Sequence, residues 1–441
     1  MLKNLLNKQN DYLCCMFLKS LFLISVIRLL TIEGTAQPLR EEKILEDRIY
    51  SETIRTVELY RTGWRMTDPV LQKEETNTLS LDFDDLSDTP ETYFYTFIHC
   101  DADWKPTDLF PEDYLEGYTE NEIRDYGSSV NTTVPYVHYH LTFPNEDIRF
   151  RITGNYILEV YKDNDPDHPA FTARFMITSG SVTITAKVTR TTGPDRLRNQ
   201  QLLLTVDYGS LPLRSPVDEL YVVIRQNGRW DNAIRAPRPT EQGNGRLVFG
   251  TPSNIIFPGG NEYRNLDIKS VRYQSPGILK IDYNPPYYNV ILEPAKIQSL
   301  GPYLTKKDLN GRFFVENSRG STADTDADYF NVFFTLPANF PFEGNVYIFG
   351  ALSQWNYTQR NRMLYNEKEH RYEATMMLKQ GMYNYLYAVK TPEAAAGDLT
   401  RIEGSHWETE NDYTILVYHR DPGERYDHLV GVKTINTITV K

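Results

Sequence analysis

The sequence predicts an all-β protein of three tandem immunoglobulin-like or E-set β-sandwich domains that follow a cleaved signal peptide. Short runs in which side chains alternate with a period of two recur along the chain, as in half-buried strands. Twenty-five prolines and twenty-five glycines supply the turns between them. A chain of 441 residues is also too long for one hydrophobic core, which rarely exceeds about 250–300 residues.

Residues 1–36 have the order of a secretory signal peptide. Lys3 and Lys8 precede an apolar stretch that ends at Leu30, and small residues follow it. The uninterrupted apolar piece inside this stretch is too short to span a membrane. We therefore expect a mature chain that begins at Gln37, is exported to the periplasm and does not insert directly into a membrane.

The rest of the chain reads as strands and turns. Runs rich in aromatic and β-branched residues favour a pleated, half-buried surface. Short helices are expected only within 39–51 and 113–126. The expected strands include 93–98, 137–143, 157–161, 181–189, 202–206, 220–224, 346–349, 372–378, 383–389 and 414–418.

Two changes in the pattern divide the mature chain into three domains. One strand group ends near residue 178, which gives an N-terminal sandwich at 37–178. The stretch 317–328 has no large apolar residue and is expected to be an exposed linker or loop. It separates a middle sandwich at 179–316 from a C-terminal E-set or immunoglobulin-like domain at 317–441.

The composition excludes several classes of protein. The 59 acidic and 47 basic residues give a net charge of −12, which repels phosphates, so no nucleic-acid partner is expected. A 40% apolar content with 13% aromatics can bury a core, which argues against intrinsic disorder. Cys14 and Cys15 leave with the signal peptide, so Cys100 cannot form an intrachain disulfide and is expected to be a small buried residue.

One polar cluster could in principle hold a metal. His99, Asp101 and Asp103 lie close in sequence, and His138 and His140 share one face of a strand. Structural zinc prefers thiolates, which the mature chain lacks. We therefore predict no metal and no cofactor.

No catalytic residues are predicted, and the chain is not expected to be an enzyme. It lacks a G-x-S-x-G serine motif and a phosphate-binding glycine loop, and spacing singles out no pair of carboxylates. The aspartates at 324–328 lack the glycine and the terminal glutamate of an EF-hand, which favours a solvated loop over a calcium site.

Three sets of short motifs occur in order between residues 97 and 264, within a resemblance to a known family that covers most of residues 45–441. They are FIHCDADW at 97–104 with DYLEGY at 113–118, YVHY at 136–139 with FP at 143–144 and GNY at 154–156, and QNGRWDNA at 226–233 with GGNEYR at 259–264. Together they resemble the plug proteins of the type 9 secretion translocon of Bacteroidetes. The resemblance implies a non-enzymatic periplasmic protein, associated with the outer membrane, that binds the translocon β-barrel and closes its channel at rest.

The C-terminal segment carries a second resemblance. The run 346–350 leads to Trp355, the motif QGMYNY follows at 380–385, and Trp407 comes after Glu403 and Gly404. These features are similar to E-set domains related to glycogen-binding modules. The alternative function is therefore a glycan-binding accessory protein, in which Trp355 and Trp407 stack on sugar rings.

Four residues are candidates for contact with the translocon. Asp101 and Trp104 belong to one turn-like sequence, and Arg229 and Trp230 belong to another. Buried tryptophan and arginine side chains often dominate interfaces, but they also pack the domain that carries them. We expect both tryptophans to mark tight turns and favour packing within the chain over a partner contact.

Overall fold

The computed structural model describes residues 45–209, 211–251, 254–318 and 323–440. Strands dominate these residues, and the helices are single turns, so the predicted all-β class is confirmed. The predicted signal peptide lies outside the described residues. Among the described helices, none combines the length and apolar character that a membrane span needs.

The first pair of sheets, here called the first sandwich, encloses one core. A six-stranded sheet faces a four-stranded sheet, and tyrosines and phenylalanines of both fill the space between them. Tyr93, Tyr95 and Phe97 point inward from β5, whereas Phe94 and Thr96 on the other face are only partly buried. The six-stranded sheet has the order β1 (Arg48–Ile49), β12 (Pro169–Thr178), β11 (Gly154–Lys162), β5 (Tyr93–Cys100) and β7 (Asn121–Glu122), with β3 (Val70–Gln72) parallel to β12. The other sheet is β2 (Ile54–Arg61), β4 (Leu79–Asp85), β9 (Val137–Phe143) and β8 (Asp125–Ser128), and α2 (Pro111–Tyr114), β6 (Leu115–Gly117) and β10 (Ile148–Phe150) lie in connections.

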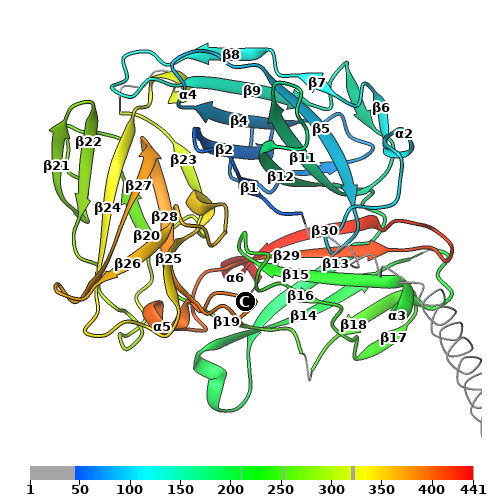
Figure 1. Ribbon diagram of the computed structural model, residues 1–441. Helices are drawn as coiled ribbons and strands as arrows, with labels where there is room; N and C mark the ends of the chain where they lie inside the picture. Colours follow the sequence, from blue (N-terminus) through cyan, green and yellow to red (C-terminus); the bar gives the residue numbers. More distant parts are fainter. Residues whose placement is uncertain (1–44, 210, 252–253, 319–322, 441) are drawn as a thin grey trace, which may run out of the picture. The chain divides into compact units, whose positions relative to one another are not determined.

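The middle sandwich combines two distant stretches of the chain. In Figure 1, the C-terminal hairpin of β29 and β30 lies beside β15. The four-stranded sheet is β16 (Ile234–Arg235), β15 (Leu220–Gln226), β29 (Asp412–His419) and β30 (His428–Asn436). The five-stranded sheet is β13 (Thr183–Arg190), β14 (Asn199–Asp207), β18 (Arg246–Phe249) and β17 (Glu241–Gly243), with β19 (Ile256–Pro258) beside β14. The helical turns η1 (Pro194–Leu197), α3 (Pro216–Glu219) and α6 (Thr437–Val440) complete this part.

A nine-stranded sheet, here called the last sheet, curls around a third core. Its order is β20 (Arg264–Asp267), β28 (Gly381–Lys390), β25 (Asn345–Phe349), β26 (Arg362–Asn366), β27 (Arg371–Lys379), β24 (Tyr329–Pro337), β22 (Tyr287–Leu292) and β21 (Ile278–Asn284), with β23 (Phe313–Val315) beside β28. The helical turns are α4 (Ala323–Asp326), η2 (Ala351–Ser353) and α5 (Thr400–Glu403).

Strand pairing does not follow the boundary predicted at residue 316. β20 and β23 precede that boundary but pair with β28, and β29 follows it but pairs with β15. The expected linker at 317–328 is also not simply exposed. Asp328 is buried, and its carboxylate accepts hydrogen bonds from the backbone N–H and the hydroxyl of Thr133. The helix expected within 113–126 is limited to α2, after which the chain forms short strands.

Candidate functional site

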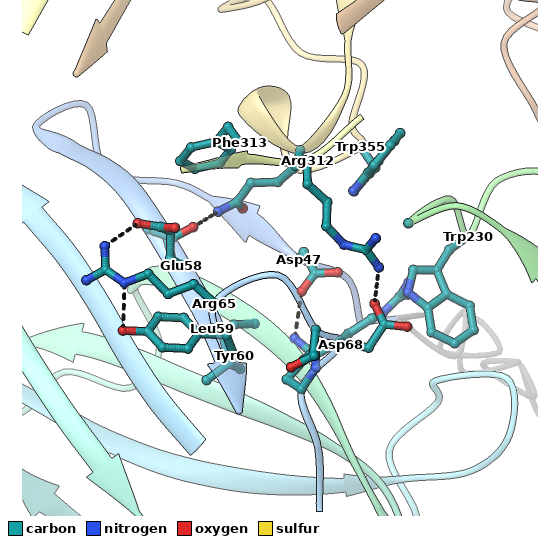
Figure 2. Close-up of a pocket in the computed structure, with 18 of the residues that line it drawn as sticks. Asp47, Glu58, Leu59, Tyr60, Arg65, Asp68, Trp230, Arg312, Phe313 and Trp355 are labelled. Carbon is teal, nitrogen blue, oxygen red and sulfur yellow. Dashed lines mark hydrogen bonds and ion pairs between the residues drawn. The ribbon is translucent and has the colours of Figure 1, made fainter. Parts of the chain in front are cut away.

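A cavity of about 170 Å³ lies where the first sandwich, the middle sandwich and the last sheet meet (Figure 2). Charged and aromatic side chains from all three parts line it. They include Glu58, Arg65 and Asp68 of the first part, Arg225 and Trp230 of the second, and Arg312, Phe313 and Trp355 of the third.

Asp68 is the central charge of this junction. Its carboxylate lies 2.5 Å from a guanidinium nitrogen of Arg225 and 3.3 Å from Nη2 of Arg312. It also accepts a hydrogen bond of 3.1 Å from the hydroxyl of Thr414. Burial raises the pKa of Asp68, but Arg225 and Arg312 outweigh it and bring the pKa to about 2. One ionised carboxylate thus connects strands and loops of all three parts.

The turn predicted at Asp101 is present and directs Trp104 inward. Oδ1 of Asp101 accepts hydrogen bonds from the backbone N–H groups of Asp103 (2.9 Å) and Lys105 (3.0 Å). This local bonding holds Trp104 in the left-handed region at a φ of 65°. The Asp101 side chain therefore orders its own turn.

Trp104 packs between the first and middle sandwiches. Its side chain is 0% exposed, and its ring meets Trp230 edge-to-face with centroids 5.1 Å apart. The guanidinium of Arg174 lies 4.6 Å from the Trp104 ring and 5.2 Å from the Trp230 ring. Cys100 is buried in the same cluster, as expected. Both tryptophans serve contacts within the chain.

Arg229 is buried as well. It forms two hydrogen bonds with the carboxylate of Asp231, of 2.9 and 2.8 Å, and a third of 3.0 Å with the carbonyl oxygen of Gly397. The guanidinium thereby joins the turn after β15 to the loop before α5. In this conformation Trp104 and Arg229 offer no surface to a partner.

The two candidate sugar-stacking tryptophans lie in different surroundings. The Trp355 ring packs edge-to-face on Phe349 with centroids 5.5 Å apart. A Cβ on Gly228 would lie 2.3 Å from Nε1 of Trp355, so this close approach requires glycine. Trp407 instead lies under the guanidinium of Arg190 on β13, 4.6 Å from it. Trp355 is half-buried among these contacts within the chain.

The histidines of the metal hypothesis are not brought together as a ligand set. His138 and His140 donate to carboxylates of β4, at 2.8 Å from Asp84 and 2.6 Å from Asp82. His99 lies on β5 in the opposite sheet, where its ring contacts Thr107 and Thr153. Burial lowers the pKa of His99 to about 4, so this ring stays neutral.

The charge on His138 is expected to make stability depend on alkaline pH. Burial lowers its pKa, but contacts with Asp82 and Asp84 outweigh burial and raise it to about 9. Because the pKa of His138 is higher in the folded chain than in the unfolded chain, its protonation stabilises the fold. This stabilisation is complete below the pKa in the unfolded chain, about 6.5, and is lost as the pH rises through about 9. The unfolding midpoint should therefore fall more steeply over this range in the wild type than in His138→Asn. Parallel slopes would contradict a charged His138.

The sequence analysis did not single out Trp64, a large exposed aromatic side chain, or the ion pairs of Asp68 with Arg225 and Arg312. Trp64 is 65% exposed and follows Gly63, whose φ is 81°. The sequence did carry a signal for Trp64: it lies between Gly63 and Arg65, outside any run of alternating apolar residues that would predict its burial. The Asp68 contacts had no such signal, because Arg312 lies 244 positions away.

Comparisons with known proteins identify a family for the first part of the chain and a solved structure similar to most of it. Residues 54–179 match the family model of the type 9 secretion system plug protein 1st domain. A hypothetical protein from Parabacteroides merdae ATCC 43184, known from a crystal structure, is 33% identical and superposes with a TM-score of 0.87. The match covers 89% of this chain and 100% of that chain. No curated protein matches the chain.

Proposed function

We propose that this chain, whose residues 54–179 match the first domain of type 9 secretion system plug proteins, is a non-enzymatic periplasmic plug that binds the outer-membrane translocon β-barrel and closes its channel at rest. The observation that carries this proposal is the match of residues 54–179 to the first plug domain. A pore wide enough for folded cargo leaks solutes when open, and a stopper must therefore keep its shape.

Ion pairs between the three parts of the chain would keep such a stopper rigid. Asp68 ties the first sandwich to Arg225 and Arg312. A second buried pair joins Asp84 of β4 to Lys379 of β27 with 2.6 Å between the charged atoms. Breaking buried pairs of this kind is costly, so the three parts resist movement relative to one another. In this proposal the last sheet, with its resemblance to E-set domains, serves as a packing module. The alternative of a glycan-binding accessory is less favoured because Trp355 is packed against Phe349.

We assign the barrel contact to exposed aromatics of the family-matched domain. Trp64, Phe110 and Tyr118 are large apolar side chains with most of their surface exposed. Exposed tryptophan and tyrosine side chains often become the dominant contacts of an interface. These residues replace Trp104 and Arg229 as the proposed anchors, because those two are buried.

Co-purification tests the proposal. The chain should co-purify with the translocon barrel from detergent-solubilised outer membranes, and Trp64→Ala should weaken that binding by roughly tenfold, or about 1.4 kcal/mol. Tyr273→Ala is the matched control, because Tyr273 is an exposed aromatic outside the matched domain. Equal retention of both variants would contradict the role of Trp64.

A deletion strain tests the plug itself. A stopper matters between transport events, so its loss should release periplasmic markers and admit large antibiotics while cargo secretion continues. Loss of secretion with an intact permeability barrier would contradict the plug and indicate an obligatory assembly component.

A further inference from the structure

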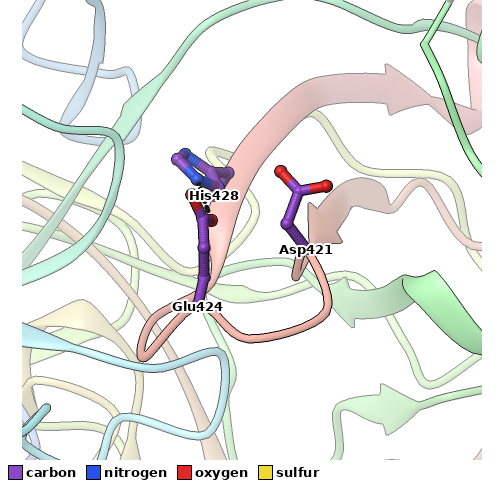
Figure 3. Close-up of side chains that lie close together, drawn as sticks. All are labelled: Asp421, Glu424 and His428. Carbon is purple, nitrogen blue, oxygen red and sulfur yellow. Dashed lines mark hydrogen bonds and ion pairs between the residues drawn. The ribbon is translucent and has the colours of Figure 1, made fainter.

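The turn between β29 and β30 brings three metal-ligating side chains together, and a fourth, His419, lies beside one of them, Asp421. His419 and His428 are directly opposite each other across the hairpin. Such cross-strand neighbours have Cβ atoms about 4.5–5.5 Å apart. Asp421 and Glu424 lie in the turn that joins them (Figure 3). Ligating atoms of Asp421, Glu424 and His428 all lie within 4.8 Å of one another.

His419 provides an independent observation. Its side chain is 7% exposed, and its Nε2 has no hydrogen-bond partner among the described residues. This nitrogen lies 3.6 Å from Oδ1 of Asp421 and 3.7 Å from Oε2 of Glu219. Both separations are too long for a hydrogen bond. The separation from Asp421 is close to the distance of about 3.4 Å between two donors bound to one tetrahedral zinc ion.

The surroundings hold these ligands in place. Nδ1 of His428 lies 3.4 Å from Oγ1 of Thr153, a contact that can fix the ring with Nε2 toward Glu424. Arg420 binds Asp427 with two hydrogen bonds, of 2.7 and 2.9 Å, which close the turn. Partners of this kind orient metal ligands and raise their affinity.

We propose that His419, Asp421, Glu424 and His428 form a zinc site that clamps the β29–β30 turn. Two imidazoles with two carboxylates suit Zn²⁺, whereas Ca²⁺ and Mg²⁺ prefer oxygen donors alone. Binding would displace the proton between His428 and Glu424, whose Nε2 and Oε2 are 2.6 Å apart. The site would also steady the contact with the first sandwich, because Asp427 of the same turn accepts a 2.9 Å hydrogen bond from the backbone N–H of Ala102. The proposal is independent of the plug function.

Calorimetric titration of the tag-free mature chain with ZnCl₂ tests the site. We expect one Zn²⁺ per chain, a higher melting temperature with Zn²⁺ than with Ca²⁺, and visible absorption of a distorted tetrahedral site with Co²⁺. His428→Ala and Asp421→Asn should each weaken binding by more than about tenfold. His168→Ala is the matched control, because His168 is an exposed histidine that also pairs with an aspartate, Asp165.

Two outcomes would overturn the proposal. One is the absence of saturable Zn²⁺ binding, or binding that His428→Ala leaves unchanged. The other is a His419→Ala variant that binds Zn²⁺ as tightly as the wild type while His428→Ala does not bind it. The metal would then be held by Asp421, Glu424 and His428 without the buried His419 ring. If His419→Ala does not fold, Asp421→Asn decides, since Asp421 is exposed and lies between the two histidines in the turn.

Discussion

Replacing Trp104 by alanine is expected to lower the free energy of unfolding by about 3–5 kcal/mol. The side chain is 0% exposed and lies between the Trp230 ring and the Arg174 guanidinium. Alanine would leave a cavity at the contact between the first and middle sandwiches and would also remove the cation–π contact. Denaturant unfolding followed by circular dichroism measures the change in the transition midpoint.

Trp64→Ala is the matched control for this measurement. Trp64 is 65% exposed, so its loss should change stability by no more than about 0.5 kcal/mol. Trp104→Phe should cost less than Trp104→Ala, because it keeps an aromatic ring and removes an indole N–H that has no hydrogen-bond partner in the described part of the chain. If Trp104→Ala were as stable as Trp64→Ala, the cluster would not hold the two sandwiches together.

The sequence predicted the local features of this fold. Alternation along 93–98 and 137–143 places Tyr93, Tyr95 and Tyr139 in one core, and the structure confirms the strands that carry them. The turn at Asp101 was also predictable, because an aspartate bonds to backbone groups two residues on. These features depend on neighbours within a few positions, which periodicity and turn chemistry describe well.

Long-range pairing could not be predicted in the same way. β15 pairs with β29 although about 190 residues separate them, and a period-two pattern does not specify which strand lies alongside. For this reason the sequence did not show that strand pairs cross the boundary predicted at residue 316. The ion pairs of Asp68 with Arg225 and Arg312 are a consequence of that pairing, so the candidate site was accessible only from the structure.

Replacing Lys379 by methionine is expected to destabilise the chain by about 3–5 kcal/mol. Lys379 and Asp84 are 2% and 1% exposed, with 2.6 Å between Nζ and Oδ2. Methionine has a similar length and fills the space, so the loss is electrostatic: Asp84 remains buried without its ammonium partner. Lys187→Met, on the exposed face of β13, is the matched control and should be nearly neutral.

The neighbours of Asp84 determine how this loss depends on pH. Tyr329 donates a 2.6 Å hydrogen bond to Asp84, and Nδ1 of His138 lies 2.8 Å from it. Lys379 lowers the pKa of His138, so in Lys379→Met the imidazole binds its proton more tightly and neutralises part of the Asp84 charge. The destabilisation should therefore be smaller near neutral pH than above about pH 9, where wild-type His138 has lost its proton. Adding Asp84→Asn to Lys379→Met should recover part of the loss, which a double-mutant cycle measures as a coupling between the two positions. A cycle without coupling, or a loss that is the same at both pH values, would show that the Asp84–Lys379 pair does not join the first sandwich to the last sheet.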